Sequence, residues 1–434
     1  MCGLTGFFDL EGAPASAVVV RRMADAIAHR GPDGEGWYTD GPLALGHRRL
    51  AVIDPTPRGQ QPMQTRDGRY VLAYNGEVYN FRELRGALEA RGRTFRSGTD
   101  TEVVLEALAT WGPAAVERFN GMFALALWDS VERTLLLARD RYGVKPLYYA
   151  QVGRTLLFGS EIKALRAHPA FRTKVSGEAL NEYFTFQNIF SDRTLFEGVR
   201  TLPAGHTLRV PLGAAELPAT EAYWDFRFKA DPTIDAETAE REVKRLFEQA
   251  VQRQLVSDVP VGSYLSGGID SGSIACVAAR SVPDLHTFTC GFDTSTASGL
   301  ELACDERARA EHLAGLYKTQ HYQVVLKAGD MERVMQPLIA HLEDPRVGQS
   351  YPNYYAARLS SRFVKVVLSG TGSDELFAGY PWRYYGPSRG NERPADYLDK
   401  YYGYWQRLVP DGLKASFFRP HLHATVEAHD TRRL

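Results

Sequence analysis

The spacing of apolar residues changes near the middle of the chain, and this change constrains the fold more than any single residue does. In residues 1–210, short alternating apolar runs typical of strands are separated by turn residues. Amphipathic helices are expected between some of these runs, at Ala17–His29, Arg82–Arg91 and Thr101–Trp111. This mixture predicts an α+β layered domain in which helices cover sheets.

From residue 235 onward, apolar strands alternate with helices of ten or more residues. The expected strands are Val259–Leu265, Leu285–Phe292, His321–Leu326 and Phe363–Leu368, and the expected helices are Ala236–Val256, Ser271–Arg280, Ala303–Tyr317, Asp330–His341 and Tyr351–Ser361. This alternation predicts an α/β domain with a parallel, doubly wound sheet over residues 235–434. The Ala- and Pro-rich stretch 211–234 has no sustained period and is predicted to be the linker.

Composition excludes several classes of protein. The 434 residues carry a formal net charge of −1. The protein therefore lacks the overall positive charge that would predict a nucleic-acid partner. The sequence contains no unbroken apolar run of about 18 residues, so no membrane span is predicted. The N-terminus lacks the pattern of a secretory signal. The cysteines Cys2, Cys276, Cys290 and Cys304 form neither a disulfide framework nor a CxxC zinc pair. A cytoplasmic protein is expected.

Cys2 directly follows the initiator methionine, and Cys-Gly is a small pair that permits removal of Met1. The first residue would then carry both a thiol and a free α-amine. The thiolate is a nucleophile, and an α-amine with a pKa of roughly 7.7–8 can accept the thiol proton near neutral pH. The alternative is a cysteine at this position by chance, and the position alone does not decide between the two.

Five further motifs follow Cys2. They are HRGPDGEGWY (29–38), GHRRLAVID (46–54), YNGEVYNF (74–81), SGTDTEVVLEAL (97–108) and ARDRYGVKPLYY (138–149). Each alone has an ordinary explanation as a turn, a surface pair or a helix cap. Together and in this order, over about residues 2–165, they resemble the class II glutamine amidotransferase domain, which has the N-terminal-nucleophile (Ntn) fold.

This resemblance implies a role for each motif residue toward glutamine. Arg49 suits the α-carboxylate, because a guanidinium fork binds two oxygens at once. Asn75 and the backbone N–H of Gly76 are implied as the oxyanion hole when Cys2 attacks the amide carbon. The rest of the implied glutamine pocket is Leu50, Ala51, Val52 and Ile53 beside Arg49, with Glu77 and Asp100 at the ammonium group.

The stretch VPVGSYLSGGIDSGSIA (259–275) is typical of a strand that turns through a glycine-rich loop into a helix. Backbone N–H groups and the helix N-terminus of such a loop can bind an anion. The hydroxyls of Ser266 and Ser271 can contact phosphate oxygens, whereas Asp270 would repel them unless a cation such as Mg²⁺ lies between. The alternative is a serine-capped turn, and the pattern matches neither GxxxxGK[ST] nor GxGxxG.

A second loop of this kind occurs in VKVVLSGTGSDELFAGY (364–380). It is expected at the carboxyl end of a parallel strand, where such sheets bind ligands. Asp374 is the expected partner of Asp270 on Mg²⁺, which takes one or two carboxylates together with phosphate oxygens and water.

The two loops resemble the ATP-pyrophosphatase domain of asparagine synthases, which is adenine-nucleotide-hydrolase-like. The resemblance implies ATP and Mg²⁺, and Cys290 as a wall residue. The implied ATP contacts are Leu265, Ser266, Gly267, Gly268, Asp270, Ser271, Cys290, Ser369 and Gly370. With the first domain, the chain resembles glutamine-hydrolysing asparagine synthetases, in which ATP activates aspartate as an acyl-adenylate and ammonia from glutamine displaces AMP.

Two departures from this family leave alternatives open. Thr371 stands where the family has an acidic residue at the acyl-adenylate site, and Glu343 or Asp344 could supply a carboxylate instead. Family members also continue further, so the 235–434 domain is interpreted as C-terminally incomplete. The alternatives are an amidotransferase for another carboxylate, in a cell-envelope sugar or a secondary metabolite, and a glutaminase-only or regulatory protein. The sequence leaves the oligomeric state undecided, with a homodimer among the options.

Overall fold

The computed structural model describes residues 1–293, 295, 305–345, 350–385 and 393–434. The chain divides into two compact units. The first unit comprises Met1–Leu180 and Ile189–Ala230, and the second comprises Asn181–Asn188 and Asp231–Leu434. Among the described residues, no helix has the length and apolar character that crossing a membrane requires.

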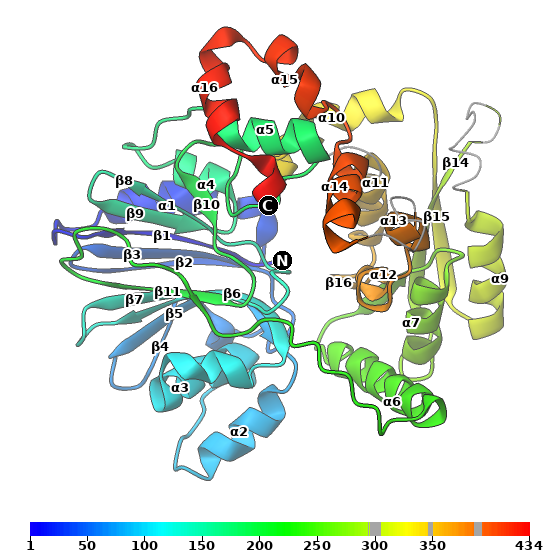
Figure 1. Cartoon of the computed structure of the whole chain (residues 1–434). Helices are drawn as coiled ribbons and strands as arrows, with labels where there is room; N and C mark the ends of the chain where they lie inside the picture. The colour runs from blue at the N-terminus through cyan, green and yellow to red at the C-terminus, as the bar shows by residue number, and fades with distance from the viewer. Residues whose placement is uncertain (294, 296–304, 346–349, 386–392) are drawn as a thin grey trace. The chain divides into compact units, whose positions relative to one another are not determined.

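Two antiparallel sheets form the centre of the first unit (Figure 1). One has the order β10-β8-β9-β1-β3-β2, with β1 Gly3–Asp9, β2 Gly34–Asp40, β3 Leu43–Arg49, β8 Tyr148–Val152, β9 Thr155–Gly159 and β10 Val199–Thr201. The other has the order β12-β11-β7-β6-β5-β4, with β4 Met63–Gln64, β5 Tyr70–Val78, β6 Gly121–Asp129, β7 Thr134–Arg139, β11 His206–Pro211 and β12 Glu221–Ala222.

Helices cover the outer faces of both sheets. On the first sheet lie α1 (Ala17–Asp25) and α4 (Ile162–Arg166). On the second lies α3 (Asp100–Trp111), and α2 (Phe81–Glu89) packs against α3 (Figure 1). The expected helix 17–29 ends at Asp25 and gives way to a 3-10 turn, Ala28–Arg30. The four layers confirm the predicted α+β Ntn-type architecture.

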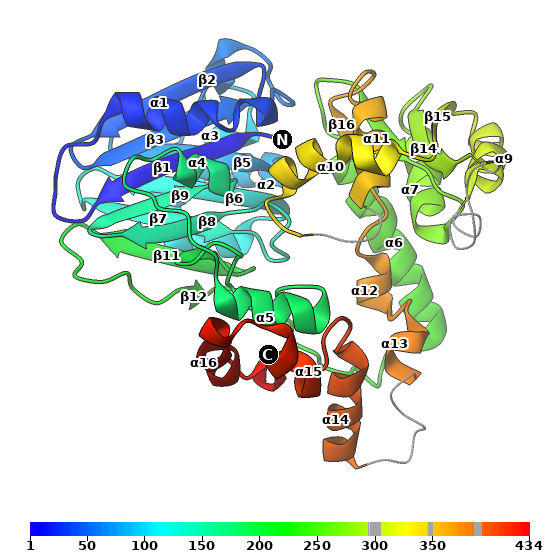
Figure 2. The ribbon, with the colours of Figure 1, turned by 90° about the horizontal axis from the view of Figure 1, so that it is seen from above.

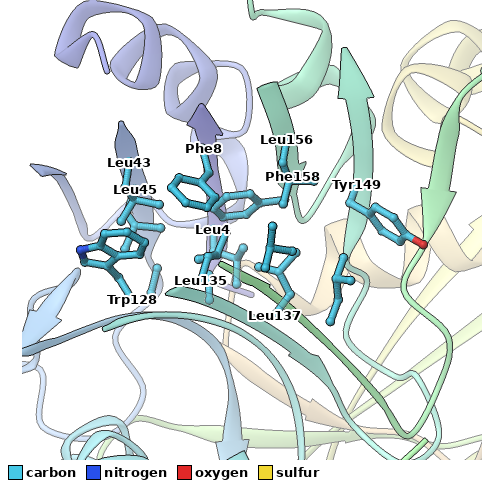
Figure 3. Close-up of a cluster of buried hydrophobic side chains, with 14 of the residues drawn as sticks. Leu4, Phe8, Leu43, Leu45, Trp128, Leu135, Leu137, Tyr149, Leu156 and Phe158 are labelled. Carbon is cyan, nitrogen blue, oxygen red and sulfur yellow. The ribbon is translucent and has the colours of Figure 1, made fainter. Parts of the chain in front are cut away.

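The main core lies between the two sheets (Figure 3). Trp128 is fully buried there and packs edge-on against Phe8, with ring centroids 5.3 Å apart. Its indole N–H donates to Asp40 at 2.8 Å, so the ring is buried without leaving its donor unpaired. A second cluster between the first sheet and helices α1 and α4 includes Val20, Met23 and Leu165.

The segment predicted as the linker, 211–234, is only partly a connection. Its first residue, Pro211, ends β11, and β12 pairs with β11 through His206 and Ala222. The ring of Trp224 contacts Tyr142 at 5.2 Å. The first unit therefore continues to Ala230, because strand pairing and ring packing hold this sequence despite its lack of period.

The second unit contains a four-stranded parallel sheet with the order β15-β14-β13-β16. Its strands are β13 Val261–Tyr264, β14 His286–Phe292, β15 Gln320–Leu326 and β16 Val366–Leu368. The chain moves outward from β13 to β15 and then returns to the other side of β13. This reversal confirms the predicted doubly wound sheet and places its switch point between β13 and β16.

Helices connect the parallel strands of this unit, as β-α-β crossovers require. The connections of β13 to β14 and of β14 to β15 run through α7 (Ile269–Ala279) and α9 (Arg307–Tyr317), whereas α10 (Asp330–Leu342) and α11 (Ser350–Ser360) precede β16 (Figure 2). The other helices among the described residues are α5 Gly177–Phe186, which the division between the units crosses, and α6 Ala236–Gln254, α12 Ser373–Phe377, α13 Pro381–Tyr385, α14 Pro394–Trp405, α15 Asp411–Phe417 and α16 Pro420–Ala428. The expected helix 303–317 begins in the structure at Arg307, and residues 303 and 304 lie outside the described residues.

Candidate active sites

Cys2 lies just before β1, and the loop that follows β3 holds its side chain. The Leu50 N–H donates to Cys2 Sγ at 3.3 Å, and the thiol reaches the Leu50 carbonyl at 3.5 Å. Burial raises the pKa of the Cys2 thiol, while the Leu50 N–H acts in the opposite direction. A backbone N–H aimed at sulfur favours the thiolate and so offsets part of the effect of burial.

Arg30 fixes the main chain of the same residue. Its Nε donates to the Cys2 carbonyl at 2.8 Å, and its Nη1 donates to Glu161 Oε1 at 2.8 Å. Hydrogen bonds from His29, Lys163 and Arg30 lower the pKa of Glu161 to about 2, although burial alone would raise it. The N-terminus is therefore held by a buried ion pair, a feature of the HRGPDG motif that sequence reasoning left without a role.

Asn75 and Gly76 lie in β5, next to β6. Asn75 is almost fully buried, and its Nδ2 has no hydrogen-bond partner within the described part of the chain. An unpaired buried donor is costly in a folded protein, so it points to an acceptor that binds there. A side chain at position 76 would come within 2.4 Å of the Met122 carbonyl, because β6 pairs closely here, and only glycine fits.

Two carboxylates from different elements interact in the same region. Asp100 begins α3 and accepts hydrogen bonds from Tyr74 Oη at 2.9 Å and from the Val78 N–H at 3.0 Å. Burial raises its pKa to about 6. Burial and the neighbouring Asp100 raise the pKa of Glu77 well above its usual range. Two carboxyl groups that repel each other in a desolvated place favour a cation between them.

Arg49 adopts a different arrangement from the one expected at a carboxylate. Its guanidinium is buried and donates to the carbonyls of Thr56 at 2.8 Å and Asp54 at 2.6 Å. These bonds hold the loop after β3 in place, because a buried guanidinium needs acceptors for its N–H groups and finds them in backbone oxygens. In this structure its donors bind the loop, and a bound carboxylate would compete for them.

The remaining predicted pocket residues form this loop. The Ala51 N–H donates to Asp33 Oδ2 at 2.8 Å, and Ala51 is buried. Val52 and Ile53 are half-buried, and the Ile53 carbonyl accepts from Arg49 at 3.4 Å.

Lys145 is a residue of this region that sequence reasoning did not assign. Its Nζ lies 3.5 Å from Met1 Sδ, and its charge interacts with Cys2 and Glu77. Burial lowers the pKa of its ammonium group. The motif ARDRYGVKPLYY contains this lysine, but only the fold brings it to the N-terminus.

In the second unit, the predicted nucleotide loop connects β13 to α7. The hydroxyls of Ser266 and Ser271 lie 2.8 Å apart, and the Gly268 N–H donates to Ser266 Oγ at 3.1 Å. Gly268 is the N-cap of α7. Because glycine has no side chain, it makes no capping hydrogen bond to the first N–H groups of the helix. A loop of this form presents N–H and O–H donors at the positive end of a helix.

The second loop, after β16, approaches the first across the switch point. A side chain at position 370 would lie 2.9 Å from the Ser271 nitrogen and 3.0 Å from Asp270 Cβ, so glycine is required for this approach. Burial, Asp374 and Glu375 together raise the pKa of Asp270. The register of the adjacent parallel strands thus brings together Asp270 and Asp374, which are about a hundred residues apart in sequence.

The other predicted nucleotide residues lie just after β13 and β16 or within the neighbouring strand β14. Leu265 is buried, and its carbonyl accepts the Thr289 hydroxyl. Burial raises the pKa of Cys290 in β14 to about 12, so this thiol stays protonated at neutral pH. Thr371 is exposed, and its hydroxyl lies 3.1 Å from Ser369 Oγ. Glu343 caps the C-terminus of α10 in the left-handed region.

Comparisons with known proteins match both units. A family model described as "Glutamine amidotransferase domain" matches residues 1–224, and one described as "Asparagine synthase" matches residues 242–434. The protein "Asparagine synthetase [glutamine-hydrolyzing] 3" of Bacillus subtilis is 34% identical over 404 residues, which cover 88% of this chain and 64% of the relative. This chain therefore spans less than two thirds of the length of that relative.

A second relative is covered more fully. "Putative asparagine synthetase [glutamine-hydrolyzing] 2" of Methanocaldococcus jannaschii is 33% identical over 403 residues, which cover 88% of this chain and 76% of the relative. A solved structure of B. subtilis glutamine phosphoribosylpyrophosphate amidotransferase, complexed with ADP and GMP, is 17% identical and matches with a TM-score of 0.39 over 64% of each chain. On the family models and the sequence relatives, the chain belongs to the glutamine-hydrolysing asparagine synthetase family.

Proposed function

We propose that the first unit hydrolyses glutamine at Cys2 and that the second unit uses ATP to activate aspartate, which the released ammonia converts to asparagine. The single observation that carries this proposal is the approach of Asp270 to Asp374 across the switch point of the parallel sheet. A glutaminase alone would need no such pair. Family membership supplies the substrate class, and the geometry of both sites fits it.

At the first site, removal of Met1 gives Cys2 an α-amine that accepts the thiol proton. The thiolate attacks the side-chain amide carbon of glutamine, and the oxyanion binds Asn75 Nδ2 and the Gly76 N–H. Glu77 and Asp100 bind the α-ammonium group, which relieves their mutual repulsion. Arg49 and residues 50–53 form the wall at the α-carboxylate. Ammonia leaves, and water hydrolyses the glutamyl thioester to glutamate.

At the second site, the Ser266–Ser271 loop and the N-terminus of α7 bind the phosphates of ATP. Leu265, Cys290, Ser369 and Gly370 contact its adenosine part, and Thr371 lies at the acyl-adenylate. Asp270 and Asp374 fit Mg²⁺, because their repulsion favours a cation and Mg²⁺ needs only one or two carboxylates beside phosphate oxygens. The described residues hold no cluster of three or more His, Cys, Asp or Glu side chains that could bind a metal ion. Bound there, Mg²⁺ would neutralise charge on the triphosphate.

The test is product analysis on the full encoded chain with Met1 removal verified by mass spectrometry. With glutamine, Mg-ATP and aspartate, we expect glutamate, AMP, pyrophosphate and asparagine. A panel of other carboxylates in place of aspartate tests the acceptor, since Thr371 replaces an acidic residue. Glutamate without AMP for any acceptor would contradict the synthetase proposal, and AMP only with a different carboxylate would correct its substrate.

A further inference from the structure

The turn after β7 is built so that Lys145 has a fixed position. Asp140 accepts the N–H groups of Tyr142 at 3.1 Å, Val144 at 3.0 Å and Lys145 at 3.0 Å. Arg139 completes the turn by donating to the carbonyls of Lys145 at 2.9 Å and Gly143 at 2.6 Å. These hydrogen bonds hold the backbone of the turn in one conformation, and they thereby fix the position of the Lys145 Cα atom, from which the side chain extends.

The lysine side chain extends from this turn to the start of the chain. Its ammonium nitrogen lies 3.5 Å from Met1 Sδ, and its charge interacts with Cys2, Glu77 and Arg30. Lys145 is half-buried, so its charge is screened less than that of a surface lysine. Its charge also acts on the present N-terminal amine, one residue before the position where the α-amine of Cys2 forms once Met1 is removed.

The N-terminus is surrounded by charges of both signs. These are Arg30 with its partner Glu161, Asp33 after the 3-10 turn, Glu77 in β5, Asp100 at the start of α3, and Asp140 and Lys145 in the turn after β7. The carboxylates disfavour a thiolate and favour a protonated amine, which is the wrong state for catalysis. Arg30 and Lys145 act against them. Burial and Arg30, followed by Lys145, already lower the pKa of the present N-terminal amine to about 6.

We propose that Lys145 is a positioning residue whose ammonium charge keeps the α-amine of the processed N-terminus neutral and its thiol ionisable, and so sets the pH range of glutamine hydrolysis. The inference rests on the proposed glutaminase function of the first unit. Lys145 exchanges no proton or bond with glutamine: the thiol proton moves to the α-amine, and the amine later passes it to the leaving ammonia. Arg30 contacts the Cys2 carbonyl and shares its charge with Glu161, whereas the Lys145 ammonium group adds a second positive charge from the turn after β7.

The test compares Lys145→Met, which keeps the length of the side chain, with Lys145→Arg, which keeps its charge. Loss of a cation raises the pKa of both the amine and the thiol. For Lys145→Met we therefore expect the acid limb of kcat/KM for glutamine hydrolysis to move to higher pH by about one unit or more. Lys145→Arg should restore most of the profile. Lys174→Met, at an exposed lysine paired with Glu197, is the matched control and should leave the profile unchanged.

A second readout does not depend on turnover. The rate of iodoacetamide alkylation of the N-terminal peptide, followed by mass spectrometry from pH 5 to 10, reports the ionisation of Cys2 alone. We expect the midpoint of the alkylation rate against pH to move upward in Lys145→Met. If circular dichroism shows that this variant folds poorly, Lys145→Gln serves as a second variant. Unchanged profiles and midpoints in both variants would overturn the inference. Persistent glutamine hydrolysis in Cys2→Ala would instead overturn the proposed function, and the two failures are thus distinguishable.

Discussion

The two units bury their candidate sites to different depths. In the first unit, Cys2, Asn75 and Asp100 lie at the edge of a core formed by two full sheets, and Asn75 and Asp100 are nearly inaccessible. In the second unit, Ser369 and Thr371 are exposed, and the flanking strands β13 and β16 have only four and three residues.

This difference indicates two ways of building a site. The first unit is preorganised, because its polar groups are fixed by packing before any substrate binds. The apolar clusters around the second sheet are small, and several large apolar side chains near its loops, such as Leu376 and Phe377, are exposed. Its loops should therefore gain more of their order from the nucleotide that binds them.

The largest expected effect is on the preorganised site. Cys2→Ala should abolish glutamine hydrolysis, because no other group can form the thioester. Nucleotide binding by the second unit should be unchanged. Glutamate release and binding of a fluorescent ATP analogue measure the two units separately, and Cys276→Ala is the matched control for loss of a thiol. Glutamate release at the wild-type rate by Cys2→Ala would remove the nucleophile assignment.

The next effect is on the open site. Asp270→Asn and Asp374→Asn should each remove ATP-dependent pyrophosphate release, since an amide lacks the charge that binds Mg²⁺ and the barrier should rise by several kcal/mol. Glutaminase activity should remain. Asp284→Asn is a suitable control, because Asp284 is an exposed turn residue with a φ of 55°, a conformation that asparagine tolerates. Normal pyrophosphate release in the folded variants would exclude both carboxylates from the site.

A smaller loss is expected at Asn75. Asn75→Ala removes one oxyanion donor and should reduce kcat for glutamine hydrolysis about 10²–10³-fold, or about 2.7–4 kcal/mol, with a lesser change in KM. Asn80→Ala, at a partly exposed asparagine that bonds the Arg118 carbonyl, tests whether loss of any neighbouring amide has this result. An equal loss in both variants would mean that Asn75 acts through the fold of β5 rather than on the reacting amide.

Much of this arrangement could be predicted from sequence because it depends on local pattern. Period and turn residues indicated both fold classes, and the expected position of both loops at the carboxyl ends of parallel strands led to the pairing of Asp270 with Asp374. Contacts set by side-chain direction could not be predicted in this way. Arg49 turns its fork toward the loop carbonyls, and Lys145 reaches the N-terminus from a turn more than a hundred residues away. The pairing of β12 was missed because a two-residue strand has no period to detect.

The smallest expected effect is the stabilisation of the second unit by Mg-ATP, which tests whether its site is less ordered than that of the first unit. Ligand that binds only the folded state stabilises it by about 2.7 kcal/mol at a hundred times its Kd, which corresponds to a rise in Tm on the order of 5–10 °C for a unit of this size. Mg-ATP should therefore stabilise the second unit, and slow hydrogen exchange in peptides from 261–271 and 364–374, while exchange in β5 and β6 stays unchanged. Asp374→Asn should lose this response and Asp284→Asn should keep it.

Equal protection of both units would mean that the nucleotide acts on the whole chain, and no protection near Ser266 would mean that this loop is as preorganised as the Cys2 site. Only protection confined to the second unit agrees with a site that the nucleotide itself orders.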